Sequence, residues 1–479
     1  MNLLRRLLQN HVLANAMFVV VLLVGTLTYF QMPRAQDPEI NFNWISIVTR
    51  LPGASAEDVE KLVTDPLEEA IQQVSDIKFV SSTSRESLSN ILVRFNDISE
   101  RTFDKRVNDL RREVQSKTNA ELPEDVDDPQ ILEITSANSF PSATVVVTGK
   151  ADDEILRRTA LNVKKDIERI KGVDDVNAAA LVEPELLVEF FPERLPANGI
   201  TPTQLADTIR GFFKDTAAGD LNIGNQQWLV RLIGTDSDPG YLARLPIIGT
   251  QGSVPVDALA RVRRGREDAT EAASFQGQPA VLYGITKQAY VNTLDLVENI
   301  RSYIEQKNQL VEQFGIQVVL LDDQSVPTRT ALRVMQGNAL LGLILVMVVA
   351  WIFLGSRISF FLGIGIPFTL AGTFILLDNT GQTLNQSVLL AIVIVLGMLI
   401  DDAVVVVEAI YYRIQRGVDA IQASLDSLRE VFSPVTSSVM TTMAAFLPLM
   451  LLPGILGDFM FVIPFVVTSA LAISLLEAY

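Results

Sequence analysis

The sequence predicts an α+β membrane protein, in which a polytopic bundle of six transmembrane helices carries a large extracytoplasmic insert of β-α-β units. Two observations predict this class. Long apolar stretches lie towards both ends of the 479-residue chain, whereas the segment from Gln31 to about Gln336 is polar and charged. Within that segment, short apolar runs recur as strand, helix and strand, as in globular α/β proteins. The 48% of hydrophobic residues and the formal charge of -17 therefore average two different parts.

Six segments come close to or reach the roughly 20 apolar residues that a helix needs to cross the hydrocarbon layer. They cover residues 11–30, 337–354, 359–377, 387–410, 434–452 and 459–479. The first also has a feature of signal peptides, because Arg5 and Arg6 precede its apolar run. That run continues to Phe30 and no small-residue cleavage site follows it, so we interpret it as an anchoring helix.

Positive residues near span ends predict which loops face the cytoplasm. They occur before the first span, between the second and third, and between the fourth and fifth, as Arg5, Arg6, Arg357, Arg413, Arg416 and Arg429. The connections 378–386 and 453–458 contain neither Lys nor Arg. The N-terminus is therefore expected in the cytoplasm, and the long insert between the first two spans outside it.

The first part of the insert predicts one β-α-β unit. The run 42–51 alternates like a strand, and Ser55 with Asp58 three positions later is typical of a helix start. Apolar residues then recur at helical spacing up to Val74, although Pro66 should kink or interrupt that helix. Strands over 77–82 and 89–95 and a helix over 102–117 complete the unit.

The same pattern then returns along the chain. We expect a strand over 142–149, a helix over 153–170 ending at Gly172, strands over 173–179 and 185–191, a helix opened by Thr201 and Pro202, a strand over 280–286, and a helix from Asn292 to about Glu312. Short strands alternating with helices predict ferredoxin-like β-α-β subdomains.

The strongest site signal is the pair Asp401 and Asp402, which follows a long apolar run in the fourth predicted span. At 1.5 Å per residue from Ser387, the pair lies about 20 Å into the layer, too deep for so short a side chain to reach water. An ionised Asp near the membrane centre costs about 2.5 to 3.5 kcal/mol on insertion scales, so such acids face a partner or a water-filled path. Two adjacent carboxylates also resist simultaneous ionisation and should titrate as a coupled unit. We therefore predict a proton site.

Two other interpretations of the pair stay open, a buried helix of a soluble protein and a pair of cation ligands, although the five other apolar spans disfavour the first. Glu408 lies on the same helical face as Asp401, near the cytoplasmic interface, and we interpret it as solvated.

No Lys occurs after Lys307 and every later Arg lies near a span end, so the positive charge that would balance Asp401 and Asp402 is expected from other sequence. A chain that stops at Tyr479, inside its sixth span, is expected to be truncated or naturally split.

Composition excludes several other classes. The acidic balance and the lack of a basic cluster argue against nucleic acid as a partner. The sequence has no Cys and a single His, His11, which excludes disulfides, thiolate zinc sites and multi-His metal centres. We find no nucleophile motif, phosphate loop or metal-ligand cluster, so an enzyme is not expected. A secondary active transporter without a bound cofactor, driven by the proton motive force, fits these features.

The order of one span, a long insert and five further spans with "GMLIDDAVVVVEAI" in the fourth resembles the first half of the resistance-nodulation-division (RND) efflux transporters. Other motifs agree, namely "PGASAEDVEKLVTDPLEEAI", "FPERLPANGITPTQLADTI", "FQGQPAVLYGITK" and "VPVDALARV". The resemblance covers the whole chain, and the paired aspartates favour the hydrophobe/amphiphile efflux branch over the metal-exporting one.

The resemblance implies a domain organisation. It consists of a first transmembrane helix (1–30), a first periplasmic porter subdomain (31–134), a second porter subdomain (135–181 and 273–330), a docking domain (182–272) and transmembrane helices two to six (331–479). It also implies a multi-pass protein of the Gram-negative inner membrane. There, proton binding at Asp401 and Asp402, answered by a Lys of the second half, would drive efflux of hydrophobic or amphiphilic compounds.

The resemblance further implies partners and a substrate site. A homotrimer is expected, in which the loop 217–228 reaches into the neighbouring subunit, together with a periplasmic adaptor (membrane fusion) protein, an outer-membrane channel and surrounding membrane lipid. Family drug pockets are rich in aromatic residues, and Phe140 matches such a position, whereas Ala179 and Asp322 stand near places where multidrug members carry aromatic residues. The alternatives are export of lipid, pigment or metal, and a non-transporting or split half-subunit that needs a partner chain.

Overall fold

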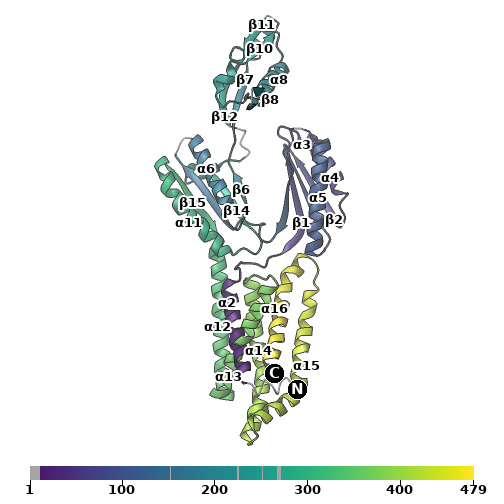
Figure 1. Ribbon diagram of the computed structural model, residues 1–479, viewed down its shortest axis with the longest axis vertical. Coiled ribbons are helices and arrows are strands. Elements are labelled where there is room, and N and C mark those ends of the chain that lie inside the picture. Colours follow the sequence, from purple (N-terminus) through teal and green to yellow (C-terminus); the bar gives the residue numbers. More distant parts are fainter. Residues whose placement is uncertain are drawn as a thin grey trace.

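The computed structural model describes residues 11–478 except 124, 151–152, 224–225, 251 and 267–270. Side chains are described for the same residues apart from His11, Asp153, 217–231, Ile400 and Asp401. The molecule is elongated (Figure 1). A helical bundle forms one end, two units of sheet and helix lie side by side above it, and a smaller unit forms the far end.

Six helices build the bundle: α2 (His11–Gln31), α12 (Ser325–Leu354), α13 (Ser356–Asn379), α14 (Gln386–Gln415), α15 (Ala420–Met450) and α16 (Gly454–Ala478). All six are long and apolar enough to cross a membrane. Within the described part of the chain the predicted number of spans is confirmed, and the protein is a multi-pass membrane protein. Most of the buried apolar side chains of the bundle form one core, and a smaller cluster at Ala350, Ile358 and Leu362 joins α12 to α13.

The connections of the bundle lie on the sides that the charge pattern predicts. Residues 380–385 and 451–453 lie at the end that carries the insert (Figure 1). The turns at Gly355 and at 416–419 lie at the opposite end, with the start of α2. The arginine-containing connections are therefore on the face away from the insert.

Four predicted span boundaries are wrong by five residues or more. The second helix begins at Ser325 instead of 337, the fourth continues to Gln415 instead of 410, the fifth begins at Ala420 instead of 434, and the sixth begins at Gly454 instead of 459. The early part of α15 is polar, so a purely apolar window misses it. It still buries one residue in every four along a single face, at Ala423, Ser427, Val431 and Val435. A narrow buried stripe of this kind is enough to hold an amphipathic helix against a bundle.

The first unit of the insert is a four-stranded antiparallel sheet with helices on one face. Its elements are β1 (Asn41–Arg50), α3 (Ala56–Val59), a π-helical turn (Glu60–Thr64), α4 (Asp65–Ile71), β2 (Ile77–Arg85), β3 (Leu88–Phe95), α5 (Glu100–Glu121) and β4 (Gln130–Thr135). The strand order is β2-β3-β1-β4. This is the order of a β-α-β-β-α-β unit of the ferredoxin-like type.

Pro66 interrupts the first helix as expected. Ser55 caps the start, because its hydroxyl accepts a hydrogen bond from the Asp58 N–H (3.3 Å). The turn Glu60–Thr64 is wound as a π-helix directly before Pro66. Proline has no N–H and its ring crowds the carbonyl four residues earlier, so the wider turn lets the chain continue in the same direction.

The second unit repeats this topology. Its elements are β5 (Ala143–Gly149), α6 (Asp153–Glu168), β6 (Val173–Ala179), β13 (Ala273–Phe275), β14 (Gln278–Lys287), α11 (Thr293–Val311), a 3-10 turn (Glu312–Phe314) and β15 (Ile316–Asp323). The strand order is β13-β14-β5-β15, and β6 also pairs with β14. Strand β15 leads directly into α12, which connects this sheet to the membrane bundle.

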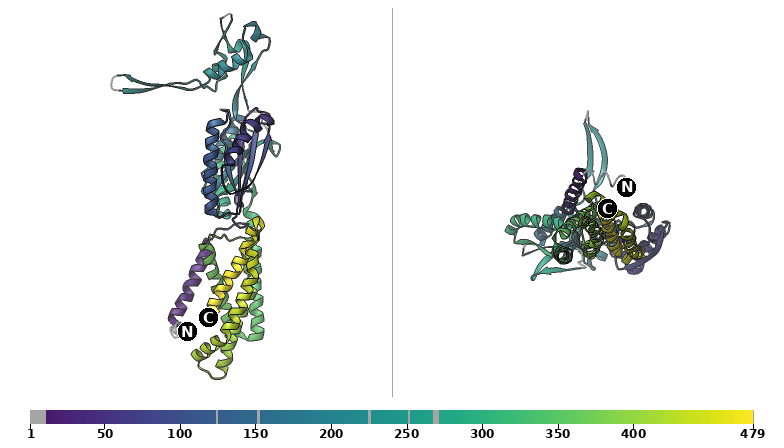
Figure 2. Two further views of the ribbon diagram at one scale, coloured as in Figure 1. Left: turned by 90° about the vertical axis from the view of Figure 1, so that its right-hand side faces the viewer. Right: turned by 90° about the horizontal axis from the view of Figure 1, so that it is seen from below.

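The third unit is inserted between β6 and β13 of the second and has its own small core. Its elements are β7 (Pro184–Phe190), α7 (Arg194–Ala197), α8 (Pro202–Phe212), β8 (Thr216–Ile223), β9 (Gln226–Leu232), α9 (Pro239–Ala243), β10 (Pro246–Gly249), β11 (Gly252–Pro255), α10 (Val256–Leu259) and β12 (Ala260–Arg266). Thr201 caps α8 by accepting a hydrogen bond from the Gln204 N–H (3.1 Å). Strands β8 and β9 form a long hairpin that extends sideways from the rest of the molecule (Figure 2).

Candidate functional site

Helix α14 occupies the centre of the bundle and packs against α12, α13, α15 and α16. Its start is fixed by the fully buried Asn385, whose side chain accepts a hydrogen bond from the Val388 N–H (3.0 Å). At 1.5 Å per residue, Asp402 lies about 24 Å from the start of α14 and about 20 Å from its end. The helix extends five residues past the predicted end, so Asp402 lies nearer to its middle than the sequence indicated.

Asp402 lies on the face of α14 that packs into the core. The residues that share this face, Val395, Leu399 and Val406, are all buried, and Asp402 itself is only 8% exposed. The spacing of four, three and four residues keeps the four side chains in one stripe. The side chain therefore lies on a buried stripe of aliphatic residues inside a membrane bundle, an environment in which an ionised acid is costly.

The structure places only part of the predicted proton site. The backbone of Asp401 belongs to α14, and its side chain lies outside the described residues. Glu408, which the sequence indicated as solvated, is exposed on α14. Asp402 is therefore the member of the pair for which burial is observed.

Two arginines at the end of the bundle away from the insert contact acids of that region. Arg413 at the end of α14 pairs with Glu430 of α15 and donates a hydrogen bond to the Ser427 hydroxyl (2.8 Å). Arg429 lies 3.9 Å from Asp426. Arg413 is about 16 Å from Asp402 along the helix axis, so this cluster belongs to the end of the bundle.

The linker of residues 32–40, between α2 and β1, connects the start of α14 to the insert. Three backbone hydrogen bonds join the two segments, from the Ala35 N–H to the Leu384 carbonyl (3.3 Å), from the Leu384 N–H to the Pro33 carbonyl (2.8 Å) and from the Gln386 N–H to the Gln36 carbonyl (3.1 Å). The linker also accepts a hydrogen bond at the Arg34 carbonyl from the Thr293 N–H (2.9 Å), at the start of α11. One short segment thus contacts both the start of α14, the helix that carries the predicted proton site, and the second sheet unit.

A buried ion pair fixes the far end of this linker. Glu39 pairs with Lys287, the last residue of β14, and both side chains are only 7% exposed. Ser136, which follows β4, holds the neighbouring backbone, because its hydroxyl accepts from the Ile40 N–H (2.8 Å) and donates to the Pro38 carbonyl (2.8 Å). Sequence reasoning missed this pair, since the two residues lie 248 positions apart.

Charge also holds the junction between the second and third units. Glu154 of α6 contacts Arg157 (3.1 Å), Arg158 (2.7 Å) and, from β12, Arg266 (2.9 Å). The hydrogen bond from Arg157, with those from Arg158 and Arg266, lowers the pKa of the Glu154 carboxyl to about 2. The carboxylate is thus ionised whenever the protein is near neutral pH.

Phe140, the predicted substrate residue, lies near the second sheet, as do Ala179 and Asp322, the two positions that depart from the aromatic pattern of the family. Phe140 is 77% exposed in the segment between β4 and β5. Asp322 of β15 lies opposite Thr144 of β5, and Ala179 of β6 lies opposite Leu282 of β14. A hollow of about 510 Å³ lies at the edge of this sheet, between the 149–150 and 275–278 segments and the end of α11, and a smaller one of about 190 Å³ adjoins residues 180–182. Phe140 lines neither, so these positions stay predictions.

Comparison with known proteins agrees with this architecture. The chain matches the AcrB/AcrD/AcrF family over residues 3–479. It is 27% identical over 466 residues to the "Multidrug resistance protein MdtC" of Pantoea ananatis, with 95% of this chain and 45% of that protein covered. It is also 27% identical over 470 residues to the protein of the same name from Shigella flexneri, with 96% of this chain and 45% of that protein covered. The chain spans less than half the length of these curated relatives.

Proposed function

The chain belongs to the AcrB/AcrD/AcrF family, and on that premise we propose that it forms the N-terminal half of an RND transporter that exports hydrophobic or amphiphilic compounds in exchange for protons. The observation that carries the proposal is the position of Asp402, buried on the core stripe of the central helix α14 near its middle. Multidrug export is the activity that the names of the relatives support.

The energetics favour a proton as the driving ion. A carboxylate in the middle of a membrane is costly when ionised, and protonation removes that cost. One charge that crosses 100 mV gains about 2.3 kcal/mol, and a pH difference adds to this. With Asp401 as its neighbour in sequence, Asp402 would change protonation as part of a coupled pair, answered by a cation from the second half of the transporter.

Proton binding in the bundle must also move the insert, and the linker 32–40 offers the physical connection. It is hydrogen-bonded to the start of α14 and joined by Glu39 to the end of β14. Energetic coupling between distant sites travels through contacts of this kind. A shift of α14 would therefore reach the second sheet through the hydrogen bonds and the ion pair of this linker.

The two repeated sheet units would be the porter subdomains (31–134, and 135–181 with 273–330) and the third unit the docking domain (182–272). The transporter would act as a homotrimer in the Gram-negative inner membrane. The extended β8–β9 hairpin (Figure 2) supports this assembly, because its two described strands pair only with each other and extend away from the rest of the molecule, where a neighbouring subunit could receive them. A periplasmic adaptor and an outer-membrane channel would complete the export path, with Phe140 near the substrate.

Dye efflux from cells that supply the complete transporter tests the proposal. Asp401→Asn and Asp402→Asn should each abolish export while expression and trimer formation stay unchanged, because each keeps the side-chain shape but cannot ionise. Glu408→Gln, an exposed acid of the same helix, is the matched control and should export normally. Wild-type efflux in both Asn variants would refute the assignment.

A further inference from the structure

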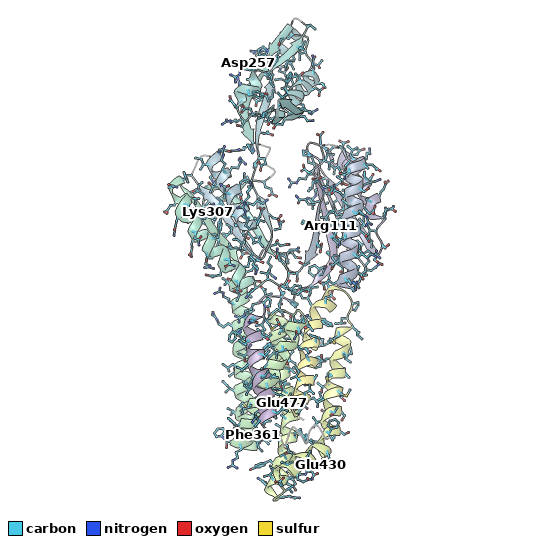
Figure 3. The ribbon with its side chains drawn as sticks, viewed as in Figure 1. Arg111, Asp257, Lys307, Phe361, Glu430 and Glu477 are labelled. Carbon is cyan, nitrogen blue, oxygen red and sulfur yellow. The ribbon has the colours of Figure 1, made fainter. Side chains whose placement is uncertain are left out.

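Glu477 is another acidic side chain inside the bundle, on α16. Figure 3 places it within the bundle, farther from the lower end than Phe361 and Glu430. Helix α16 packs against α13, α14 and α15. The Glu477 side chain is partly buried there, and among the described residues no Lys or Arg forms an ion pair with it.

Helix α13 leaves space for this carboxylate at Gly365. A methyl group built on Gly365 would lie 2.5 Å from the Glu477 Oε1 atom and 3.1 Å from its Cδ atom. Any other residue at position 365 would therefore displace the carboxylate. A glycine inside a helix costs about 0.5 to 1 kcal/mol relative to alanine, and here the glycine lies directly against the end of the Glu477 side chain.

A small cavity of about 10 Å³ borders the carboxylate. It is lined by Leu362, Gly365, Ile366 and Thr369 of α13, Leu399 and Ala403 of α14, and Glu477. Its volume is near the lower limit for holding one water molecule. Leu399 and Ala403 lie three positions before and one position after Asp402, so the cavity borders the turn of α14 that carries the buried aspartate, although Asp402 itself does not line the cavity.

The other charged groups of the neighbouring helices lie at other levels. On α13 they are Arg357 and Asp378, about 12 and 20 Å from Gly365 along the axis. On α14 and α15 the remaining ones are Asp401, Asp402, Glu408, Arg413, Asp426, Arg429 and Glu430. Arg413 pairs with Glu430, and Arg429 lies beside Asp426. The charged groups of these neighbouring helices that lie at the same depth in the bundle as the cavity are therefore Asp401 and Asp402.

An acid at this place has few ways to stay ionised. Thr369 is the one uncharged polar side chain of the cavity lining, and the other neighbours are aliphatic or glycine. An ionised carboxylate among apolar side chains in a membrane is costly, and a second acid nearby increases the cost of ionising both. Binding a proton removes both penalties at once.

We propose that Glu477 is an additional proton-binding site of the transporter, which exchanges its proton with Asp402 across the cavity between α13, α14 and α16. The proposal rests on the proposed function, because it assigns a role within the same proton pathway. In the step, the O–H bond of the protonated Glu477 breaks and an O–H bond forms on the Asp402 carboxylate. A water molecule in the cavity carries the proton between them, and nothing else is exchanged.

Infrared difference spectroscopy of the complete transporter, titrated with pH, tests the proposal directly. A carboxyl C=O band that titrates in the wild type should be missing in Glu477→Gln and retained in Glu477→Asp. Its midpoint should move by about one pH unit or more in Asp402→Asn, because coupled acids influence each other by at least this amount. Glu408→Gln is the control and should leave this band unchanged. Identical spectra for the wild type and Glu477→Gln would overturn the proposal.

Export measurements separate this proposal from the function on which it rests. The pH profile of export should shift by about one pH unit or more in Glu477→Gln and stay unchanged in Glu408→Gln. If Glu477 had only a structural role, the near-isosteric Gln would preserve the profile. A normal profile in Glu477→Gln together with lost export in Asp402→Asn would refute the role of Glu477 alone. Normal export in Asp402→Asn would refute the proposed function itself.

Discussion

Replacing Lys287 by Met should weaken the junction between the bundle and the insert far more than the loss of an exposed lysine. Lys287 ends β14 and pairs with Glu39 of the linker, and each side chain is 7% exposed. The Met side chain keeps an apolar stem of similar length but carries no charge. The substitution therefore leaves the Glu39 carboxylate buried without its cation.

The expected magnitude follows from burial. Removing one partner of a buried pair costs about 3 to 5 kcal/mol, mainly because the other charge remains buried without compensation. The pair Lys61–Glu57 in the same insert is 65% and 75% exposed, and such pairs contribute about 0.2 to 1 kcal/mol. Lys61→Met is therefore the matched control. The double variant Glu39→Met with Lys287→Met removes both charges and should recover most of the loss.

Hydrogen exchange of the complete transporter measures this effect locally. A cost of 3 to 5 kcal/mol corresponds to about two to nearly four orders of magnitude in an opening equilibrium, so the backbone amides of the linker 32–40 should exchange much faster in Lys287→Met. The same amides should keep their protection in Lys61→Met. Equal protection in the two single variants, or no recovery in the double variant, would refute the reasoning.

Two further predictions concern packing and pH. Gly25 of α2 lies against α13, and a methyl group there would be 2.4 Å from the Ala371 carbonyl oxygen, so Gly25→Ala should destabilise the bundle by about 1 to 3 kcal/mol. The control is Gly337→Ala, where the methyl group meets no described atom within 4 Å, and this variant should be neutral or slightly stabilising. Thermal unfolding in detergent compares the two variants. The arginines that lower the pKa of Glu154 from its ordinary 4.5 to about 2 stabilise the folded state fully above pH 4.5 and lose this effect as the pH falls towards 2. Glu154→Gln should thus lower the Tm at neutral pH by an amount that shrinks on acidification, and a pH-independent difference would contradict this.

Sequence reasoning predicted the elements whose signals are local. Apolar length revealed all six spans, and the side-chain caps at Ser55 and Thr201 marked two helix starts. Pro66 predicted an interruption, although the π-helical turn by which the chain accommodates it depends on packing. The start of α15 was missed because an amphipathic helix has a polar face, and an apolar window averages over both faces.

Contacts between distant segments were beyond prediction from one sequence. Glu39 and Lys287 show no local pattern that pairs them, and their contact exists only because the linker passes the end of β14. The same holds for Gly365 and Glu477, whose relation is steric and depends on how α13 packs against α16. The burial of Asp402 could be expected, because two acids inside an apolar span are unusual in any fold, whereas the proton role of Asp401 and Asp402 stays a prediction. The counterpart expected from the second half stays a prediction.

The most direct test of the proton-coupled mechanism is to measure proton movement during export. Proteoliposomes that contain the complete transporter and an internal pH-sensitive dye would be given a substrate gradient. We expect a counterflow of protons in the wild type and none in Asp401→Asn or Asp402→Asn. Substrate movement without proton movement in the wild type would contradict the account.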